Sequence, residues 1–306
     1  MTRRHGGGNA ISVHRLLLNR ARETNRTFNE LLQYFAMERF LYRLSKSSYA
    51  DRFVLKGALM LSVWHAPRSR PTMDIDLLGR TSNDVEAVIA VVREVCVQDV
   101  EPDGMVFDAS TVEGERITED ADYEGVRVRV QGHLGTARVV VRVDVGFGDL
   151  VIPPAELAEW QPILDFPAPQ LLGYSRESTI AEKLDAMVKF GALNSRMKDF
   201  FDIWLLSRQF DFDGQILGKA VEATFSKRGT EIPPVPVALT ASFAEDPDKI
   251  VQWRAFLRRN QLTETPTELP ELIASIATFL APMTKALAVG EPFRGVWRAP
   301  GPWTEL

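Results

Sequence analysis

The sequence is poor in the residues on which many metal centres and all disulfide frameworks depend. Cys96 is the only cysteine among 306 residues, so the chain can form neither an internal disulfide nor a cysteine cluster for zinc. Its four histidines are scattered, and none has His-Glu-x-x-His spacing. Walker A, Gly-x-Ser-x-Gly and Gly-x-Gly-x-x-Gly motifs are also missing. The familiar zinc, P-loop, serine-hydrolase and dinucleotide-binding signatures are therefore excluded.

Long apolar runs are missing too, so we expect no membrane span. Residues 1–8 are basic and glycine-rich without an apolar stretch, which does not fit a secretory signal. With a single cysteine, this favours a cytoplasmic location. The 45% hydrophobic and 25% charged content is typical of a globular protein.

Charge is unevenly distributed along the chain. Residues 1–50 carry nine basic and three acidic side chains, whereas residues 81–125 carry two basic and thirteen acidic ones. The basic start suits a nucleic acid or an acidic partner, and equally a solvated helix face. The overall charge of −5 argues against a dedicated duplex-DNA binder.

Hydrophobic periodicity predicts an α+β N-terminal half, residues 1–155, and an all-α C-terminal half, residues 156–306. Thr27 and Glu30 form a capping box at the start of a long helix. The predicted helices cover 11–23, 28–44, 53–64, 85–97, 179–190, 195–208, 213–227, 247–260 and 268–288. Valine-rich alternation predicts strands over 124–134 and 136–148.

Two aspartates one residue apart, Asp74 and Asp76, stand in a short apolar strand pattern. Alternate side chains of a strand share a face, so both carboxylates point the same way, while Met73, Ile75 and Leu77 point into a core. Two adjacent carboxylates repel each other unless a cation lies between them, and Mg²⁺ is the simplest such cation. An isolated Asp-x-Asp is usually a solvated strand face, so the context decides.

Asp144 provides that context, because it lies on the polar face of the valine-rich strand over 136–148. If the two strands are neighbours, Asp144 joins Asp74 and Asp76 around a metal cluster of the kind that serves phosphoryl or nucleotidyl transfer. The alternative is a surface ion pair of Asp144 with Arg138 or Arg142.

Two charged groups lie on predicted helices of the C-terminal half. Lys183 stands one turn into its helix, where a lysine can contact phosphate oxygens. Asp199 and Asp202 are three residues apart and share a helix face with Arg196 nearby. By themselves these would be ordinary solvated charge pairs.

Taken in order, these pieces resemble the AbiEii/MenT nucleotidyltransferase-like toxins of bacterial toxin–antitoxin and abortive-infection systems. The resemblance covers about half of the chain. It rests on four segments: Lys56-Gly57 with Arg70-x-Thr72-x-Asp74-x-Asp76, then Val143-Asp144-Val145, then Glu182-Lys183-Leu184, then Arg196-x-Lys198-Asp199-x-x-Asp202.

The resemblance implies a polymerase-β-like mixed sheet with flanking helices, followed by a helical domain, with the site in the cleft between them. It implies that Asp74, Asp76 and Asp144 bind Mg²⁺, and that Lys183 contacts the triphosphate of an NTP. Asp202, or Asp199, would orient Lys183 or accept the proton of the attacking hydroxyl. Lys56, Gly57 and Thr72 would help to bind the nucleotide.

The activity implied is transfer of a nucleotide to tRNA or another RNA 3′ end, which blocks growth until a cognate antitoxin acts. The chain departs from the wider pattern at Ala58, where a serine usually follows the glycine, so backbone N–H groups, Lys56 or Ser62 would hold the phosphate. Two alternatives stay open: an acceptor that is a protein or small molecule, and a non-catalytic nucleotide-binding module.

Overall fold

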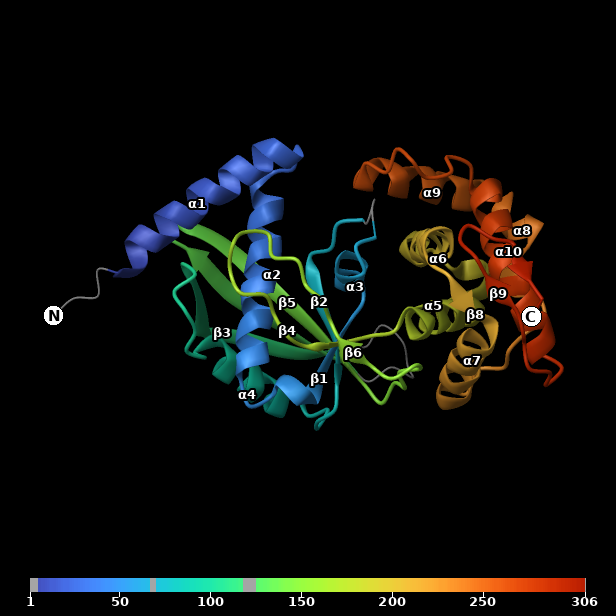
Figure 1. Cartoon of the computed structure of the whole chain (residues 1–306), viewed down its shortest axis with the longest axis horizontal. Helices are drawn as coiled ribbons and strands as arrows, with labels where there is room; N and C mark the ends of the chain where they lie inside the picture. The colour runs from blue at the N-terminus through green and yellow to red at the C-terminus, as the bar shows by residue number, and fades with distance from the viewer. Residues whose placement is uncertain (1–4, 67–69, 118–124, 306) are drawn as a thin grey trace. The chain divides into compact units, whose positions relative to one another are not determined.

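The computed structural model of the chain describes residues 5–66, 70–117 and 125–305 (Figure 1). The chain forms two compact units. The first contains Met1–Trp64, Thr72–Gly148 and Glu156–Gly173, and the second contains His65–Pro71, Asp149–Ala155 and Tyr174–Leu306. The boundary expected between residues 155 and 156 falls where short segments of the chain alternate between the units.

A mixed seven-stranded sheet forms the centre of the first unit, in the order β3-β4-β5-β2-β1-β7-β6. Its strands are β1 (Phe53–Lys56), β2 (Asp74–Gly79), β3 (Met105–Ile117), β4 (Gly125–Leu134), β5 (Ala137–Phe147), β6 (Glu156–Leu157) and β7 (Leu172–Gly173). β2 pairs with β5 in parallel and with β1 antiparallel. The mixed sheet of the expected fold class is confirmed.

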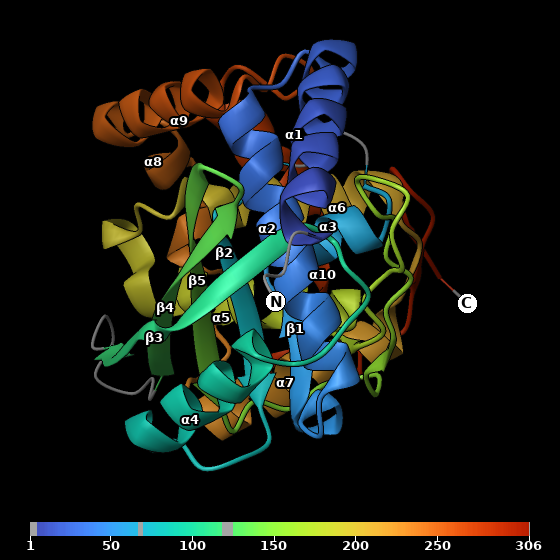
Figure 2. The ribbon, with the colours of Figure 1, turned by 90° about the vertical axis from the view of Figure 1, so that its left-hand side faces the viewer.

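One face of this sheet is apolar and carries the helices. Val128, Val143 and Ile75, from three neighbouring strands, are at most 1% exposed. Against this face pack α2 (Phe28–Lys46) and α4 (Val85–Cys96), which Figure 2 shows beside β3, β4 and β5. Because side chains alternate along a strand, the opposite face receives the polar residues.

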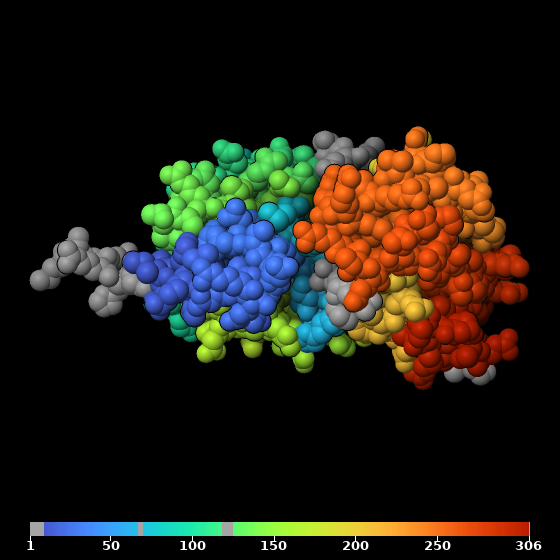
Figure 3. All heavy atoms as spheres, turned by 90° about the horizontal axis from the view of Figure 1, so that it is seen from above, coloured from blue at the N-terminus to red at the C-terminus, as the bar shows by residue number. Residues whose placement is uncertain are grey.

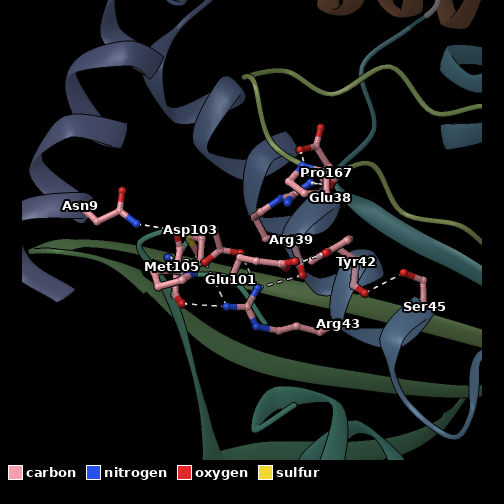
Figure 4. A network of polar contacts seen from close by, with 11 residues as sticks. Asn9, Glu38, Arg39, Tyr42, Arg43, Ser45, Glu101, Asp103, Met105 and Pro167 are labelled. Carbon is pink, nitrogen blue, oxygen red and sulfur yellow. Dashed lines mark hydrogen bonds and ion pairs between the residues drawn. The ribbon is translucent and has the colours of Figure 1, made fainter. Parts of the chain in front are cut away.

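Helix α2 begins as its capping box predicts, since the backbone N–H of Glu30 donates to the hydroxyl of Thr27. Along its buried length it holds two charged pairs (Figure 4). The guanidinium of Arg43 donates to both oxygens of Asp103, at 2.7 and 3.0 Å. Arg39 donates to Glu38 at 2.7 Å and to the carbonyl of Pro167 at 2.8 Å. These bonds satisfy charges that the surrounding apolar residues cannot solvate.

Helix α1 (His5–Thr24) precedes α2 and carries the basic start of the chain. Val13 and Leu17 face the unit, at 1% and 0% exposed. Arg20 on the outer side pairs with Glu23 and keeps half of its side chain in solvent. The helix expected over residues 11–23 is therefore confirmed.

The helix expected over residues 53–64 is wrong in its first half. Phe53–Lys56 form strand β1, buried throughout between β2 and β7, and only Leu59–Val63 are helical, as α3. Pairing on both sides outweighs the weak local preference for helix. Met73, expected in the core, is 53% exposed because it precedes the first residue of β2. The strand β3 had no counterpart among the predicted elements.

Helices dominate the second unit: α5 (Arg176–Phe190), α6 (Met197–Gln209), α7 (Gly214–Arg228), α8 (Ala241–Ala244), α9 (Pro247–Asn260) and α10 (Leu269–Leu287). All of the helices expected after residue 178 are present, and α8 is an additional helix that was not foreseen. In Figure 3 the orange atoms of α9 form part of this unit's surface.

A small three-stranded sheet joins the C-terminal tail to these helices. It consists of β8 (Phe212–Asp213), β9 (Val296–Trp297) and β10 (Trp303–Thr304). Trp297 is 2% exposed, and its indole donates to the carbonyl of Ser207 at 2.6 Å. Phe279 stacks on Trp303 with a 5.6 Å ring separation. These aromatic side chains anchor the tail to the helices of the unit.

Cys96 is buried, and burial raises the pKa of its thiol to about 12, which suits an inert core residue. No helix among the described residues has the length and apolarity needed to span a membrane.

Candidate active site

The predicted carboxylates of the first unit lie on adjacent strands. In the parallel pairing of β2 with β5, Asp76 stands opposite Asp144, and Asp74 stands opposite Arg142. Paired residues of neighbouring strands point to the same face of a sheet. The structure therefore brings Asp74, Asp76 and Asp144 onto one polar face.

Arginines from the same face hold two of these carboxylates. Arg127 on β4 lies opposite Asp144 and donates to both of its oxygens, with Nε–Oδ1 2.8 Å and Nη2–Oδ2 2.7 Å. Arg142 on β5 reaches Asp74, with Nη1–Oδ1 3.0 Å. The alternative of an ion pair at Asp144 is thus partly right, although the arginine is neither Arg138 nor Arg142. Arg127 was not among the predicted site residues, yet the alternation of arginine and valine in β4 could have indicated it.

Gly57 is shaped by its proximity to Asp76. It follows β1 with φ +70°, and a Cβ atom at this position would overlap the carboxylate of Asp76. Lys56, the last residue of β1, stands directly opposite Asp76 and is 9% exposed. Glycine at position 57 therefore lets the Asp76 carboxylate lie against the backbone, where the Cβ of any other residue would overlap it.

These three carboxylates suit a divalent cation in their oxygen chemistry and in their shared face. Among the described residues, no group of three or more histidines, cysteines, aspartates or glutamates is arranged to hold a metal ion. The pairing of Asp144 with Arg127 engages both oxygens of one of the three candidate ligands.

Replacing Gly57 with alanine tests this close approach. We expect Gly57→Ala to lower the free energy of unfolding by about 1–2 kcal/mol for the positive φ and by about 1–3 kcal/mol more for the overlap with Asp76. Gly229→Ala is the matched control, because Gly229 also has a positive φ, but a Cβ added there would meet no atom within 4 Å. Urea unfolding measures both, and equal losses would contradict the steric role assigned to Gly57.

Helix α2 positions the start of β2. The backbone N–H of Thr72 donates to the hydroxyl of Tyr34 at 2.9 Å, and Thr72 is 9% exposed. The side-chain amide of Gln33 donates to the carbonyls of Met73 and Val140, each at 3.1 Å, and so ties β2 to β5. From the sequence, Gln33 and Tyr34 are recognisable only as members of a helix, because their partners are distant along the chain.

A second cluster lies in the other unit, between α5 and α6. Lys183 Nζ lies 2.8 Å from an oxygen of Asp199 and 2.8 Å from an oxygen of Asp202. Arg196 Nε donates to Asp199 at 2.8 Å. Arg70 donates to both oxygens of Asp202, each at 2.9 Å. Both aspartates contact Lys183 at the same distance, so the contacts favour neither of them as its partner.

Basic side chains outnumber acidic ones in this cluster. Three basic groups, Arg70, Lys183 and Arg196, surround two carboxylates whose side chains are at most 3% exposed. Burial would raise the pKa of Asp199, but Lys183 and Arg196 outweigh it and lower that pKa. Burial would likewise raise the pKa of Asp202, but Arg70 and Lys183 lower it. Carboxylates with lowered pKa values are weak general bases, so orienting Lys183 suits them better than accepting a proton.

These shifts predict how stability depends on pH. A carboxylate with a folded pKa below its unfolded value adds stability above the unfolded value of about 4, and this stability is lost as the pH falls through the folded pKa. We expect the free energy of unfolding to decrease from pH 5 to pH 2 less steeply in Asp199→Asn than in wild type. Asp248→Asn, at an exposed site on α9, should follow the wild-type slope. Parallel slopes for all three proteins in chemical unfolding would contradict the shift assigned to Asp199.

Glu182, beside Lys183 in the sequence, takes part in a different cluster. It accepts a hydrogen bond from the hydroxyl of Tyr174 at 2.6 Å. Arg228, at the end of α7, contacts Glu182, Asp149 and Asp185. Burial disfavours the charged form of Arg228 and would lower its pKa, but the three carboxylates outweigh burial and raise that pKa. This cluster fastens the segment before β6 to α5 and α7.

Comparison with known proteins identifies the family of the chain. Residues 39–281 match the family model described as "Nucleotidyl transferase AbiEii toxin, Type IV TA system". The chain belongs to the AbiEii nucleotidyltransferase toxin family. The match includes all the predicted site residues, from Lys56 to Asp202, and leaves α1 and the C-terminal tail outside.

Two solved structures are also similar to this chain. An H. pylori protein described as a presumed nucleotidyltransferase aligns with 15% identity and a TM-score of 0.48, over 86% of this chain and 96% of that one. JHP933 from Helicobacter pylori aligns with 14% identity and a TM-score of 0.46, over 86% and 93% of the two chains. No curated protein sequence gives a significant match.

Proposed function

We propose that this AbiEii-family protein uses Mg²⁺ to transfer a nucleotide from an NTP to the 3′ end of tRNA or another RNA. The observation that carries the proposal is the placement of Asp74, Asp76 and Asp144 on one face of two paired strands. Oxygen ligands gathered in this way suit Mg²⁺, which would neutralise the phosphates of the NTP and supply electrostatic stabilisation during transfer.

The reaction requires one bond to form and one to break. The 3′-hydroxyl oxygen of the RNA attacks the α-phosphorus of the NTP, the bond to the bridging oxygen of the β-phosphate breaks, and pyrophosphate leaves with the electron pair. The hydroxyl proton passes to solvent. In this scheme Lys183 contacts the triphosphate, and Asp199 and Asp202 orient Lys183. The nucleotide is also bound by Lys56, Gly57 and Thr72.

A labelling assay tests the proposal. Purified protein is incubated with each α-³²P-labelled NTP, Mg²⁺ and total tRNA, with and without EDTA. We expect label on tRNA from one or two NTPs, and none with EDTA. Label on protein or on a small hydroxylated molecule would show that the acceptor is that molecule and not RNA. NTP binding without any transfer would favour a non-catalytic module. The family implies an antitoxin partner, and co-expression with that partner should restore growth.

A further inference from the structure

Asp144 and Asp74, which are candidate metal ligands, have arginine partners. Arg127 grips both oxygens of Asp144 in a forked arrangement, at 2.8 and 2.7 Å. This is the geometry in which a guanidinium binds a carboxylate most strongly. Arg142 makes a single contact to Asp74, and its buried Nε has no hydrogen-bond partner among the described residues.

The Arg127–Asp144 pair differs from an ordinary surface ion pair on the same sheet. Arg129 stands two residues from Arg127 on β4 and contacts Glu115 at 2.7 Å, with 44% and 55% of the two side chains exposed. Arg127 and Asp144 are 22% and 17% exposed, so water competes less for their charges. Arg127 is thus both better shielded and better aligned than its neighbour.

We propose that Arg127 is a positioning residue of the metal site that holds Asp144 in the metal-free protein and releases it when a divalent cation binds. Arg142 acts in the same way, more weakly, at Asp74. This inference rests on the proposed function, because it takes Asp144 as a metal ligand. The guanidinium and the cation compete for the same oxygens, so the affinity for metal depends on the strength of the Arg127–Asp144 pair.

Metal binding to the purified protein tests this exchange without measuring transfer. Mn²⁺ serves as the probe, and isothermal titration gives its Kd. We expect Arg127→Gln to bind Mn²⁺ about tenfold more tightly than wild type. Arg127→Lys keeps the charge but loses the forked contact, so we expect an intermediate Kd; it also serves if Arg127→Gln fails to fold.

Arg129→Gln is the matched control, because it removes the same charge from the same face of the same strand, and the ion-pair partner of Arg129 is Glu115 on β3. We expect its Kd to stay within about twofold of the wild-type value. Adding Asp144→Asn to Arg127→Gln should abolish the gain, since the released carboxylate is then missing.

The possible results separate this inference from the proposed function. If wild type binds Mn²⁺ and Arg127→Gln binds it no more tightly than Arg129→Gln, the exchange is wrong and the metal site stands. If neither wild type nor Arg127→Gln binds Mn²⁺, with or without NTP, both the exchange and the metal-dependent function are overturned.

Discussion

Replacing Asp76 with asparagine is expected to reduce nucleotide transfer at least about 10³-fold, which makes it the substitution with the largest expected effect on activity. Asp76 is the middle carboxylate of the proposed metal site: it shares β2 with Asp74 and stands opposite Asp144 on β5. Asparagine keeps the size of the side chain and removes the negative charge that would bind Mg²⁺. The rate of label transfer to tRNA at saturating NTP measures the loss.

The loss of transfer in Asp76→Asn reports on catalysis only if this variant folds like the wild type. Asp76 is partly exposed at the polar face of the sheet, so we expect the melting temperature to change by only a few degrees. Asp108→Asn is a suitable control, because Asp108 lies on the polar face of β3 and bonds to Ser110. Transfer within tenfold of wild type by Asp76→Asn would exclude Asp76 as an essential metal ligand.

Replacing Lys183 with methionine is expected to cause the largest loss of stability, about 3–5 kcal/mol in the free energy of unfolding. The ammonium group of Lys183 lies 2.8 Å from both Asp199 and Asp202, which are almost fully buried. Methionine fills much of the space of the aliphatic stem but leaves these carboxylates with Arg196 and Arg70 alone. Removing one partner of a buried ionic group is costly because the remaining charges stay desolvated. Urea unfolding measures the change.

A second substitution shows whether charge is the cause. Adding Asp199→Asn to Lys183→Met removes one of the uncompensated charges, so the double variant should be more stable than the sum of the single losses predicts. Lys219→Met, at an exposed position of α7, should change the free energy of unfolding by less than about 0.5 kcal/mol. Strict additivity would show that Lys183 stabilises the unit by packing alone.

Local patterns along the chain were sufficient for much of the fold. The valine alternation of β4 and β5, the capping box of α2 and the helical periodicity after residue 178 each depend on neighbours within a few positions. Such signals act over short distances, so they survive folding unless pairing or burial opposes them. Residues 53–56 show that opposition, because strands on both sides turn an apolar helix-like segment into β1.

The candidate site residues Asp74, Asp76, Asp144 and Lys183 could all be named from residue type, spacing and family resemblance. Which charged side chain pairs with each of them could not be assigned from the sequence. Arg127 contacts Asp144, and Arg70 contacts Asp202, across 17 and 132 positions of sequence. Contacts of this kind depend on strand register and helix packing, which burial of the whole apolar face decides. The sequence therefore supplied the chemistry of the site, and the tertiary structure alone decided which charges neutralise one another.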